Sequence, residues 1–383
     1  MLSREELAGW LKLGTTPGIG RAAARRLLAA LGSPERVLGA DHATLAMLAG
    51  ADVASVLLQR DPREEALLDA TERWLGESSA AAPRDLVVLG DPRYPELLLR
   101  TADPPLLLFT LGQVALLSAP SVAMVGSRGA TPQGMDNARA FGRFLSERRL
   151  TVVSGMAMGI DGAAHEGGLA GPGSTVAFVG TGLDVAYPRR HARLMERIAQ
   201  QGLVASEFPL RTEALARHFP QRNRLIAGIS LGTLVVEAAV ESGSLITARM
   251  ALEAGREVFA IPGSIHSPQS RGCHRLIQEG AILVETGDDV LRELRLGTAA
   301  GAPVARLSRP QASLFDDAVP DDATPGPDAA LLAALGHDPV TFDALSARTG
   351  LPTERLAGRL LELELAGQLQ RLPGGLLQRR TAT

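Results

Sequence analysis

The chain has 383 residues, of which 45% are hydrophobic and 21% charged, a composition typical of a globular protein with two or three domains. Its single cysteine, Cys273, excludes an intramolecular disulfide and a multi-cysteine metal site, and no motif predicts a cofactor. The formal net charge of −3 argues against a generally basic nucleic-acid-binding protein. Any anion-binding site must therefore come from a local concentration of positive charge.

The first residues, MLSREELAGW, lack the basic stretch and the apolar core of a secretory signal. No apolar run approaches the roughly 18 to 20 residues that a membrane-spanning helix requires. We therefore expect a cytoplasmic protein that does not enter a membrane.

Residues 1–80 are predicted to form a small all-α domain, because apolar residues recur at helical spacing in REELAGWLKL, RAAARRLLAAL and ADVASVLLQ. Within this domain, TTPGIGRAAARRLL resembles a helix-hairpin-helix or SAM-like element. Its glycines permit a tight turn whose amides, at the positive end of the next helix, can meet a phosphate. A plain packing joint between two helices explains the same pattern, and both interpretations stay open.

Residues 86–296 are predicted to form an α/β domain with a doubly wound, Rossmann-like parallel sheet. Near-continuous apolar runs alternate here with amphipathic segments, which is typical of a sheet covered by helices on both faces. The predicted strands are residues 121–126, 151–155, 174–180, 203–207, 233–238, 257–263 and 281–284.

Residues 297–328 are rich in Asp, Pro and Ala and are predicted to be an acidic, disordered linker. Residues 329–383 give the order helix, helix, helix and two short strands, which predicts a winged helix. Its expected recognition helix, TERLAGRLLELELAG, carries more glutamates than arginines and would read a major groove poorly. We expect it to contact protein or to play a subsidiary role, with Arg371, Arg379 and Arg380 as possible DNA-backbone contacts.

The ends of the predicted strands carry small and hydroxylated residues, as in Gly126-Ser127, Ser154-Gly155 and the stretch from Gly243 to Thr247. Ligands of a doubly wound sheet bind at the carboxyl ends of its strands, where such residues expose amides suited to oxyanions. The spacing of a dinucleotide-binding GxGxxG motif and a GKS or GKT phosphate loop are both absent. A nicotinamide dehydrogenase and an ATP hydrolase are therefore not expected.

Carboxylates near the strand ends have a structural and a catalytic interpretation. Asp161 and His165 are four residues apart on a predicted helix, and we favour helix capping by Asp161 and packing by His165 over acid/base chemistry. Glu237 and Glu241 are paired carboxylates in a catalytic interpretation, although one helical turn gives the same spacing.

Arginines also gather at the predicted strand ends: Arg128 follows the first strand, Arg189 and Arg190 the third, and Arg222 and Arg224 precede the fifth. Residues 189–224 hold eight arginines and three glutamates, a local balance of +5. Three separate segments thus bring guanidinium groups to one edge of the sheet. Repeated oxyanions are their natural ligand, and a nucleic-acid backbone is the commonest of these.

Several blocks carry a more specific resemblance: VGSR, SGMAMGID, GLDVAYPRRH, FPQRNRLIAG and VVEAAVESGSLITARMALEAGREVFAIPG, in this order. The chain resembles the DNA processing protein A (DprA/Smf) family from about Asp91 to Glu285. The resemblance implies a homodimer that binds single-stranded DNA, protects it, and loads the recombinase RecA onto it during natural transformation. It implies no catalytic turnover.

The resemblance also implies which residues bind DNA. Carried over to this sequence, they are Gly126, Ser127, Arg128, Ser154, Gly155, Arg222, Asn223, Arg224, Gly243, Ser244 and Thr247, with Arg249 as a further charge. Arg222 and Arg224 are expected to clamp phosphates together. Phe219 and Tyr187 are the nearest candidates for base stacking.

Two other functions stay open at this point. Rossmann-like enzymes of the lysine-decarboxylase-like group cleave nucleotide monophosphates with arginines and a strand-end glutamate, a role that Glu237 or Glu241 would fill. That reading does not explain the two flanking helical domains. A transcription regulator acting through the winged helix would instead bind duplex DNA and lose that binding without residues 329–383.

Overall fold

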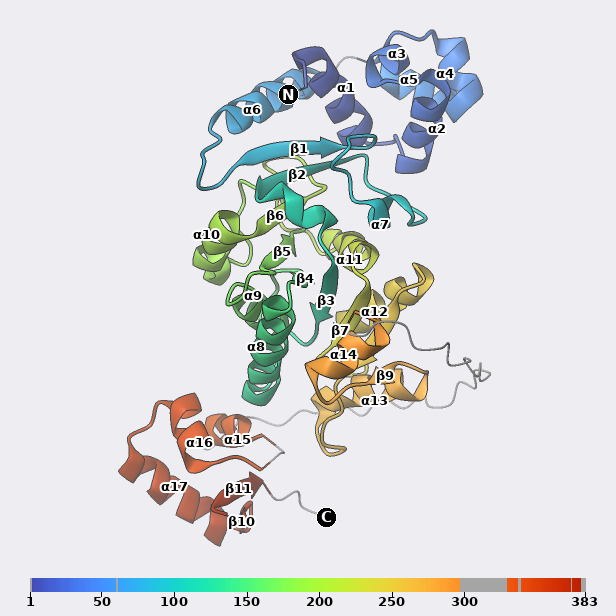
Figure 1. Cartoon of the computed structure of the whole chain (residues 1–383). Helices are drawn as coiled ribbons and strands as arrows, with labels where there is room; N and C mark the ends of the chain where they lie inside the picture. The colour runs from blue at the N-terminus through green and yellow to red at the C-terminus, as the bar shows by residue number, and fades with distance from the viewer. Residues whose placement is uncertain (1, 60, 297–328, 337–338, 373, 380–383) are drawn as a thin grey trace.

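The computed structural model describes residues 2–59, 61–296, 329–336, 339–372 and 374–379. The N-terminal helices lie at one end of the molecule, the α/β domain in the middle and the C-terminal domain at the other end (Figure 1). The predicted linker, residues 297–328, lies outside the described residues. Within the described parts, no helix combines the length and apolarity that crossing a membrane requires.

Six helices form the N-terminal part: α1 (Arg4–Thr15), α2 (Arg21–Leu31), α3 (Pro34–Leu38), α4 (His42–Ala49), α5 (Ala51–Leu58) and α6 (Pro62–Gly76). Ser3 begins α1 with a capping box that it shares with Glu6. The turn between α1 and α2 contains Gly18 with a φ of 92°, a backbone conformation that glycine adopts without strain. The all-α expectation for this region agrees with these elements.

The sheet has nine strands: β1 (Arg84–Val88), β2 (Leu107–Gly112), β3 (Ser121–Val125), β4 (Thr151–Ser154), β5 (Thr175–Phe178), β6 (Leu203–Ser206), β7 (Gly232–Val235), β8 (Glu257–Ala260) and β9 (Ile282–Leu283). Their order is β1-β2-β6-β5-β4-β3-β7-β8-β9. Strands β3 to β9 pair in parallel and correspond to the seven predicted strands. The antiparallel strands β1 and β2, which extend one edge, were not predicted.

The α/β domain contains helices α7 (Glu96–Leu99), α8 (Pro132–Glu147), α9 (Ile160–Gly168), α10 (Ala192–Gln201), α11 (His218–Ile229), α12 (Gly243–Glu253), α13 (Arg271–Gln278) and α14 (Gly287–Glu293). Side chains of α8, α9 and α14 join the apolar cluster on one face of the sheet, to which Val152 of β4 contributes. Side chains of α11, α12 and α13 join the cluster that contains Val153. Because successive strand residues point to opposite faces, the central sheet is covered on both sides. This confirms the doubly wound, Rossmann-like fold.

The N-terminal helices share an apolar core with the antiparallel edge of the sheet. Trp74 of α6 packs edge-on against Phe109 of β2, with ring centroids 6.1 Å apart. Leu13, Leu27 and other buried residues of α1 and α2 belong to the same cluster as Leu107 of β2. The helical domain is therefore fixed to the sheet by buried apolar contacts.

The C-terminal domain contains α15 (Ala329–Leu335), α16 (Phe342–Thr349), α17 (Thr353–Leu365) and the hairpin of β10 (Leu369–Leu372) and β11 (Leu376–Arg379). It has its own apolar core, and the order of its elements confirms the predicted winged helix. Arg348 of α16 donates to Gln133 Oε1 at 2.7 Å and to Asp136 Oδ2 at 3.2 Å, both on α8. These polar contacts join the winged helix to the α/β domain.

Candidate nucleic-acid interface

A pocket of about 500 Å³ opens at the carboxyl edge of the parallel sheet, between the loop after β3, helix α11 and the start of α12. Strand β3 lies between β4 and β7, where the strand order reverses, and doubly wound sheets bind their ligands at this position. Eight residues predicted from the sequence line the pocket: Gly126, Ser127, Arg128, Arg222, Asn223, Gly243, Ser244 and Thr247.

Arg222 is the most buried cation of the pocket, with a relative exposure of 3%. Its Nη1 donates to the carbonyl of Phe178 at 2.7 Å and to the carbonyl of Gly155, while its buried Nε has no hydrogen-bond partner. Burial lowers its pKa to about 10, so the guanidinium stays protonated at neutral pH. Within the described residues, no carboxylate pairs with Arg222 at ion-pair distance. The charge of Asp161, which lines the same pocket, opposes the effect of burial on Arg222 without forming an ion pair with it, so the guanidinium has no ion-pair partner among the described residues and can bind an anionic ligand.

Gly155 is required beside this guanidinium. A Cβ atom at position 155 would overlap the guanidinium of Arg222, so a side chain there would push Arg222 from its place. Ser154, the last residue of β4 and also a predicted site residue, does not line the pocket. Its hydroxyl donates to the carbonyl of Met124 at 2.6 Å, which ties β4 to β3.

Asp161 and His165 hold the loop between β4 and α9. The carboxylate of Asp161 lines the pocket and accepts from the amide of Ala157 at 3.2 Å. Burial raises its pKa, although the nearby charge of Arg222 opposes that shift. Gly159 occupies the N-cap position of α9, so Asp161 supports the preceding loop instead of capping the helix as we expected.

His165 is fully buried and contacts the same loop. Its Nε2 accepts from the amide of Met156 at 3.3 Å, and its Nδ1 lies 2.7 Å from the hydroxyl of Thr175. Because the hydroxyl of Thr175 itself donates to the carbonyl of Val152, Nδ1 is the donor to Thr175. Burial lowers the pKa of His165 to about 3, which keeps the ring neutral. His165 is therefore a packed structural residue, as the sequence favoured.

Arg128 supplies a second, exposed cation at the mouth of the pocket. Its guanidinium lies 5.1 Å from the ring centroid of Phe219, and Phe219 lies 5.7 Å from the ring centroid of Tyr187. Tyr187 is 44% exposed. The two aromatic rings thus extend the site beyond the cations, with a surface on which a base can stack.

Helix α12 presents its amino end to the pocket. Ser242 caps it, and the hydroxyls of Ser242 and Ser244 lie 2.7 Å apart. Ser244 and Thr247 are buried against the pocket, one helical turn from each other. The free amides and partial positive charge at the start of a helix favour an anion. The pocket therefore combines two arginines, hydroxyls and a helix terminus that all suit an oxyanion.

Besides Ser154, Gly155 and Arg224, three predicted arginines are absent from the pocket lining. Arg189 and Arg190 are exposed in the short 3-10 helix Arg189–His191, next to Tyr187 and outside the pocket lining. Arg249 is exposed on α12 two residues after Thr247, which places it on the opposite side of the helix. These arginines are available to solvent but are not part of the cluster around Arg222.

Arg224 corrects the expectation of two arginines clamping the same phosphates. Because residues two apart on a helix point in opposite directions, α11 directs Arg222 to the pocket and Arg224 away from it. The guanidinium of Arg224 forms an ion pair with Glu207 and donates to the carbonyl of Asp103. Its charge is neutralised by a protein partner.

Glu237 has a structural role that the catalytic alternative did not anticipate. Its carboxylate accepts from the hydroxyl of Thr131 at 2.5 Å and from the amide of Thr131 at 2.9 Å. Thr131 in turn caps α8. Glu241 is exposed and lines the pocket, so the two carboxylates do not act as a pair at one site. Among the described residues, no group of acidic, His and Cys side chains is placed to hold a metal ion.

Gln269 is a pocket residue that the sequence analysis missed. It lies in the short 3-10 helix Pro268–Ser270, and its buried side-chain oxygen has no hydrogen-bond partner. No motif marks this position; the amide of Ala238 donates to the carbonyl of Gln269 at 2.7 Å and ties it to the segment that follows β7. A partner for this side chain would have to come from a ligand or solvent.

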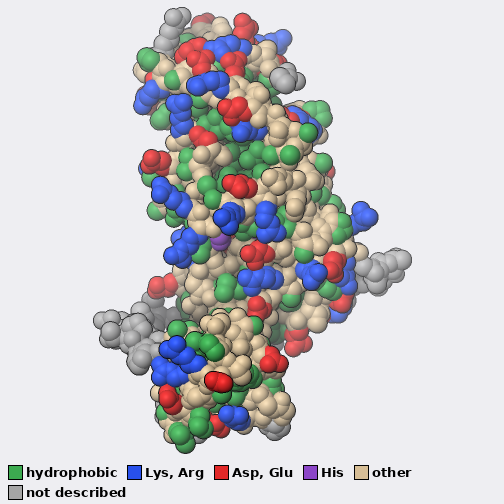
Figure 2. Space-filling view, turned by 90° about the vertical axis from the view of Figure 1, so that its left-hand side faces the viewer, with side chains coloured by type: hydrophobic (Ala, Val, Ile, Leu, Met, Phe, Trp, Pro, Cys, Tyr) green, Lys and Arg blue, Asp and Glu red, His purple; other side chains and the backbone are tan. Residues whose placement is uncertain are grey.

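The face of the molecule shown in Figure 2 is not predominantly basic. On the face shown in Figure 2, acidic and basic side chains are interspersed, and no single continuous basic area appears. This distribution agrees with the net charge of −3. Anion binding at the pocket would therefore depend on the cations that line it, Arg128 and Arg222.

Comparison with known proteins supports a single family. The family model of DNA recombination-mediator protein A matches residues 85–295, and that of the DprA winged helix domain matches residues 316–375. Protein Smf of Escherichia coli (strain K12) is 45% identical over 290 residues, which cover 76% of each chain. DNA processing protein DprA of Streptococcus pneumoniae is 50% identical over 203 residues, 53% of this chain and 72% of that protein.

Two solved structures agree with these matches. The X-ray structure of DprA from Streptococcus pneumoniae has a TM-score of 0.65 at 38% identity and covers 76% of this chain and 98% of that one. The structure of DNA processing protein A from Helicobacter pylori, which describes a single-stranded DNA binding mode of that protein, has a TM-score of 0.51 at 28% identity. It covers 55% of this chain and 96% of the Helicobacter pylori chain. The chain described here therefore belongs to the DNA processing protein A (DprA/Smf) family.

Proposed function

We propose that this protein binds single-stranded DNA in the pocket at the carboxyl edge of its sheet, without catalytic turnover. The observation that carries the proposal is the buried guanidinium of Arg222, which lines the pocket without a carboxylate partner among the described residues. A buried cation without an ion-pair partner is costly unless an anion joins it. A phosphate of the DNA backbone is the anion that the family membership favours.

The remaining groups of the pocket suit a polymer of phosphates and bases. Arg128 and the amino end of α12 offer further positive charge for neighbouring phosphates. Phe219 and Tyr187 offer aromatic faces, which accept any base, so we expect little sequence preference. A duplex pairs its bases internally and cannot stack them on these rings, so the single strand should be preferred.

The wider role is proposed from the family. We infer that the protein acts in the cytoplasm as a homodimer, protects incoming single-stranded DNA from nucleases and loads RecA onto it during natural transformation. The family membership supports this role, and the described pocket supports its first step, which is the capture of a single strand.

Fluorescence anisotropy of labelled oligo-thymidine and of the matching duplex, at two salt concentrations, tests the proposal. The wild type should prefer the single strand, and its affinity should fall as salt rises because binding releases counter-ions. Arg222→Gln should weaken binding, whereas the matched control Arg143→Gln, on the exposed side of α8, should not.

Other outcomes point elsewhere. Release of ribose phosphate from a mononucleotide, without single-strand binding, would support the hydrolase. Preference for a duplex that disappears when residues 329–383 are removed would support a winged-helix regulator. Either result would contradict the proposal.

A further inference from the structure

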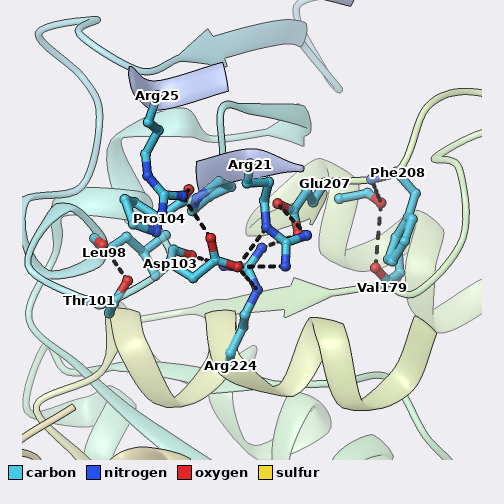
Figure 3. Close-up of polar contacts among 12 residues, drawn as sticks. Arg21, Arg25, Leu98, Thr101, Asp103, Pro104, Val179, Glu207, Phe208 and Arg224 are labelled. Carbon is cyan, nitrogen blue, oxygen red and sulfur yellow. Dashed lines mark hydrogen bonds and ion pairs between the residues drawn. The ribbon is translucent and has the colours of Figure 1, made fainter. Parts of the chain in front are cut away.

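Five charged side chains connect the N-terminal helical domain to α11, the helix that carries Arg222. We call them the interdomain arginine network; its members are Arg21, Arg25, Asp103, Glu207 and Arg224 (Figure 3). They come from α2, from the loop between α7 and β2, from the end of β6 and from α11. Segments far apart in the sequence thus meet at one place.

Asp103 is the centre of the network. Its Oδ2 accepts from Arg21 Nε at 2.6 Å and its Oδ1 accepts from Arg25 Nη1 at 2.7 Å, so two residues of α2 hold one carboxylate. Arg25 also donates to the carbonyl of Pro104 at 3.1 Å. Burial opposes ionisation of Asp103, but the hydrogen bonds from the two arginines outweigh it and lower the pKa of this carboxyl group. Two arginines of the N-terminal domain therefore bind the loop that contains Asp103.

Arg224 of α11 contacts the same loop and also Glu207. It donates to the backbone carbonyl of Asp103 and pairs with Glu207, whose side chain is only 11% exposed. Arg21 Nη1 lies 3.5 Å from the second carboxylate oxygen of Glu207. Arg21 therefore contacts both acidic residues that hold Arg224, as Figure 3 shows. Removing one partner from such a partly buried cluster leaves an uncompensated charge.

Apolar packing fixes one half of α11 more firmly than the other. Residues 225–229 are buried in the core of the sheet face, whereas residues 219–221 are partly or fully exposed. The first half is held by polar and ring contacts, including the stacking of His218 on Phe208, with ring centroids 4.2 Å apart. Arg224 lies at the boundary between the halves, where its contacts with Glu207 and Asp103 restrain the helix. The rotation of the helix about its axis sets where Arg222 points.

We propose that the N-terminal domain positions Arg222 for DNA through the interdomain arginine network, in which Arg224 is a positioning residue and makes no contact with phosphate. This inference rests on the proposed function of the pocket. It assigns the N-terminal domain a role in single-strand binding although none of its residues lines the pocket.

The test compares Arg21→Gln/Arg25→Gln with Arg26→Gln in the full-length protein. Arg26 lies on the same helix, is exposed and is outside the network, so Arg26→Gln serves as the matched control. Two quantities are measured: hydrogen exchange of the amides of residues 218–224, and affinity for oligo-thymidine across a salt series. Arg21→Lys/Arg25→Lys retains the charges and tests rescue if the glutamine variant folds poorly.

The double glutamine variant should exchange the amides of residues 218–224 about tenfold faster, because a local restraint on the helix is lost. It should bind oligo-thymidine at least about fivefold more weakly, the low end of coupling between two sites. The slope of log K against log salt should stay at the wild-type value, because no phosphate contact is removed. The control should match the wild type, and the lysine variant should recover part of both losses.

Three results would overturn the inference. Unchanged exchange in residues 218–224 would show that the network does not hold the helix. Faster exchange with unchanged affinity would show that the position of the helix does not matter to binding. A smaller salt slope would show that Arg21 or Arg25 contacts phosphate directly. If the wild type bound no single strand, the proposed function would fail, while the exchange result would still decide whether the network positions α11.

Discussion

The two sides of α11 carry arginines that differ in their ion-pair partners. Arg222 has backbone carbonyls as partners and, within the described residues, no carboxylate at ion-pair distance, whereas Arg224 pairs with Glu207 and lies near Asp103. Both side chains are largely buried. The comparison teaches that burial alone does not make an arginine a ligand-binding residue. The residue that lacks an ion-pair partner is the one with a reason to bind an anion.

The largest effect is expected on the side of α11 that carries Arg222. Arg222→Gln removes the charge that has no ion-pair partner in the described part of the chain and should weaken oligo-thymidine binding by about 10- to 100-fold, the range expected for a charge-assisted hydrogen bond. Anisotropy titration at low salt measures this loss, and circular dichroism checks that the variant is folded. Affinity within about twofold of the wild type in a folded variant would remove Arg222 from the site.

As the pH falls, the stability contributed by His165, beside the pocket, should be lost before that contributed by Asp103 of the interdomain arginine network. The folded pKa of His165, about 3, lies below its ordinary value of 6.5, so the unfolded chain binds the extra proton first. Its stability contribution is therefore complete above pH 6.5 and is lost as the pH falls towards 3. Between pH 7 and pH 5 the loss is about 2 kcal/mol.

The interdomain arginine network should keep its contribution to stability between pH 7 and pH 5. The pKa of Asp103 is lowered, so its contribution is present above the ordinary pKa of an aspartate and is lost only in stronger acid. Urea unfolding at pH 7 and pH 5 measures the difference for the wild type and for His165→Gln. An equal drop in both proteins would rule out His165 as its source.

Crowding the guanidinium of Arg222 is the next test. Gly155→Ala places a methyl group where that guanidinium lies, and we expect binding about tenfold weaker because the arginine must move. Gly358→Ala, where a Cβ meets no atom within 4 Å, is the control and should bind like the wild type. Full affinity of a folded Gly155→Ala variant would show that the observed place of Arg222 is not required.

The fold was predictable where local patterns carry it. The apolar runs of β3 to β9 alternate with helices, so their burial and parallel pairing could be inferred without tertiary knowledge. Strands β1 and β2 escaped prediction because they pair with each other and with β6 in antiparallel fashion, outside that alternation. Short apolar runs such as RDLVV do not distinguish a strand from a helix.

The site residues at the strand ends could be predicted from the sequence, whereas the direction in which α11 points its arginines could not. Ser127 and Gly243 follow strands, and the edge of a parallel sheet brings such residues together. The orientation of Arg222 and Arg224 depends on the helical phase of α11, which two arginines around one asparagine do not reveal. The pairing of Arg21 with Asp103 joins positions 82 residues apart, and no local pattern encodes it.

The most direct measurement is the salt dependence of oligo-thymidine binding for the wild type, Arg222→Gln and Arg224→Gln. If Arg222 meets a phosphate and Arg224 only positions α11, the slope of log K against log salt falls by about 0.7 for Arg222→Gln. Arg224→Gln then binds about fivefold more weakly with the slope of the wild type. A slope reduced equally in both variants would contradict the division of roles across α11.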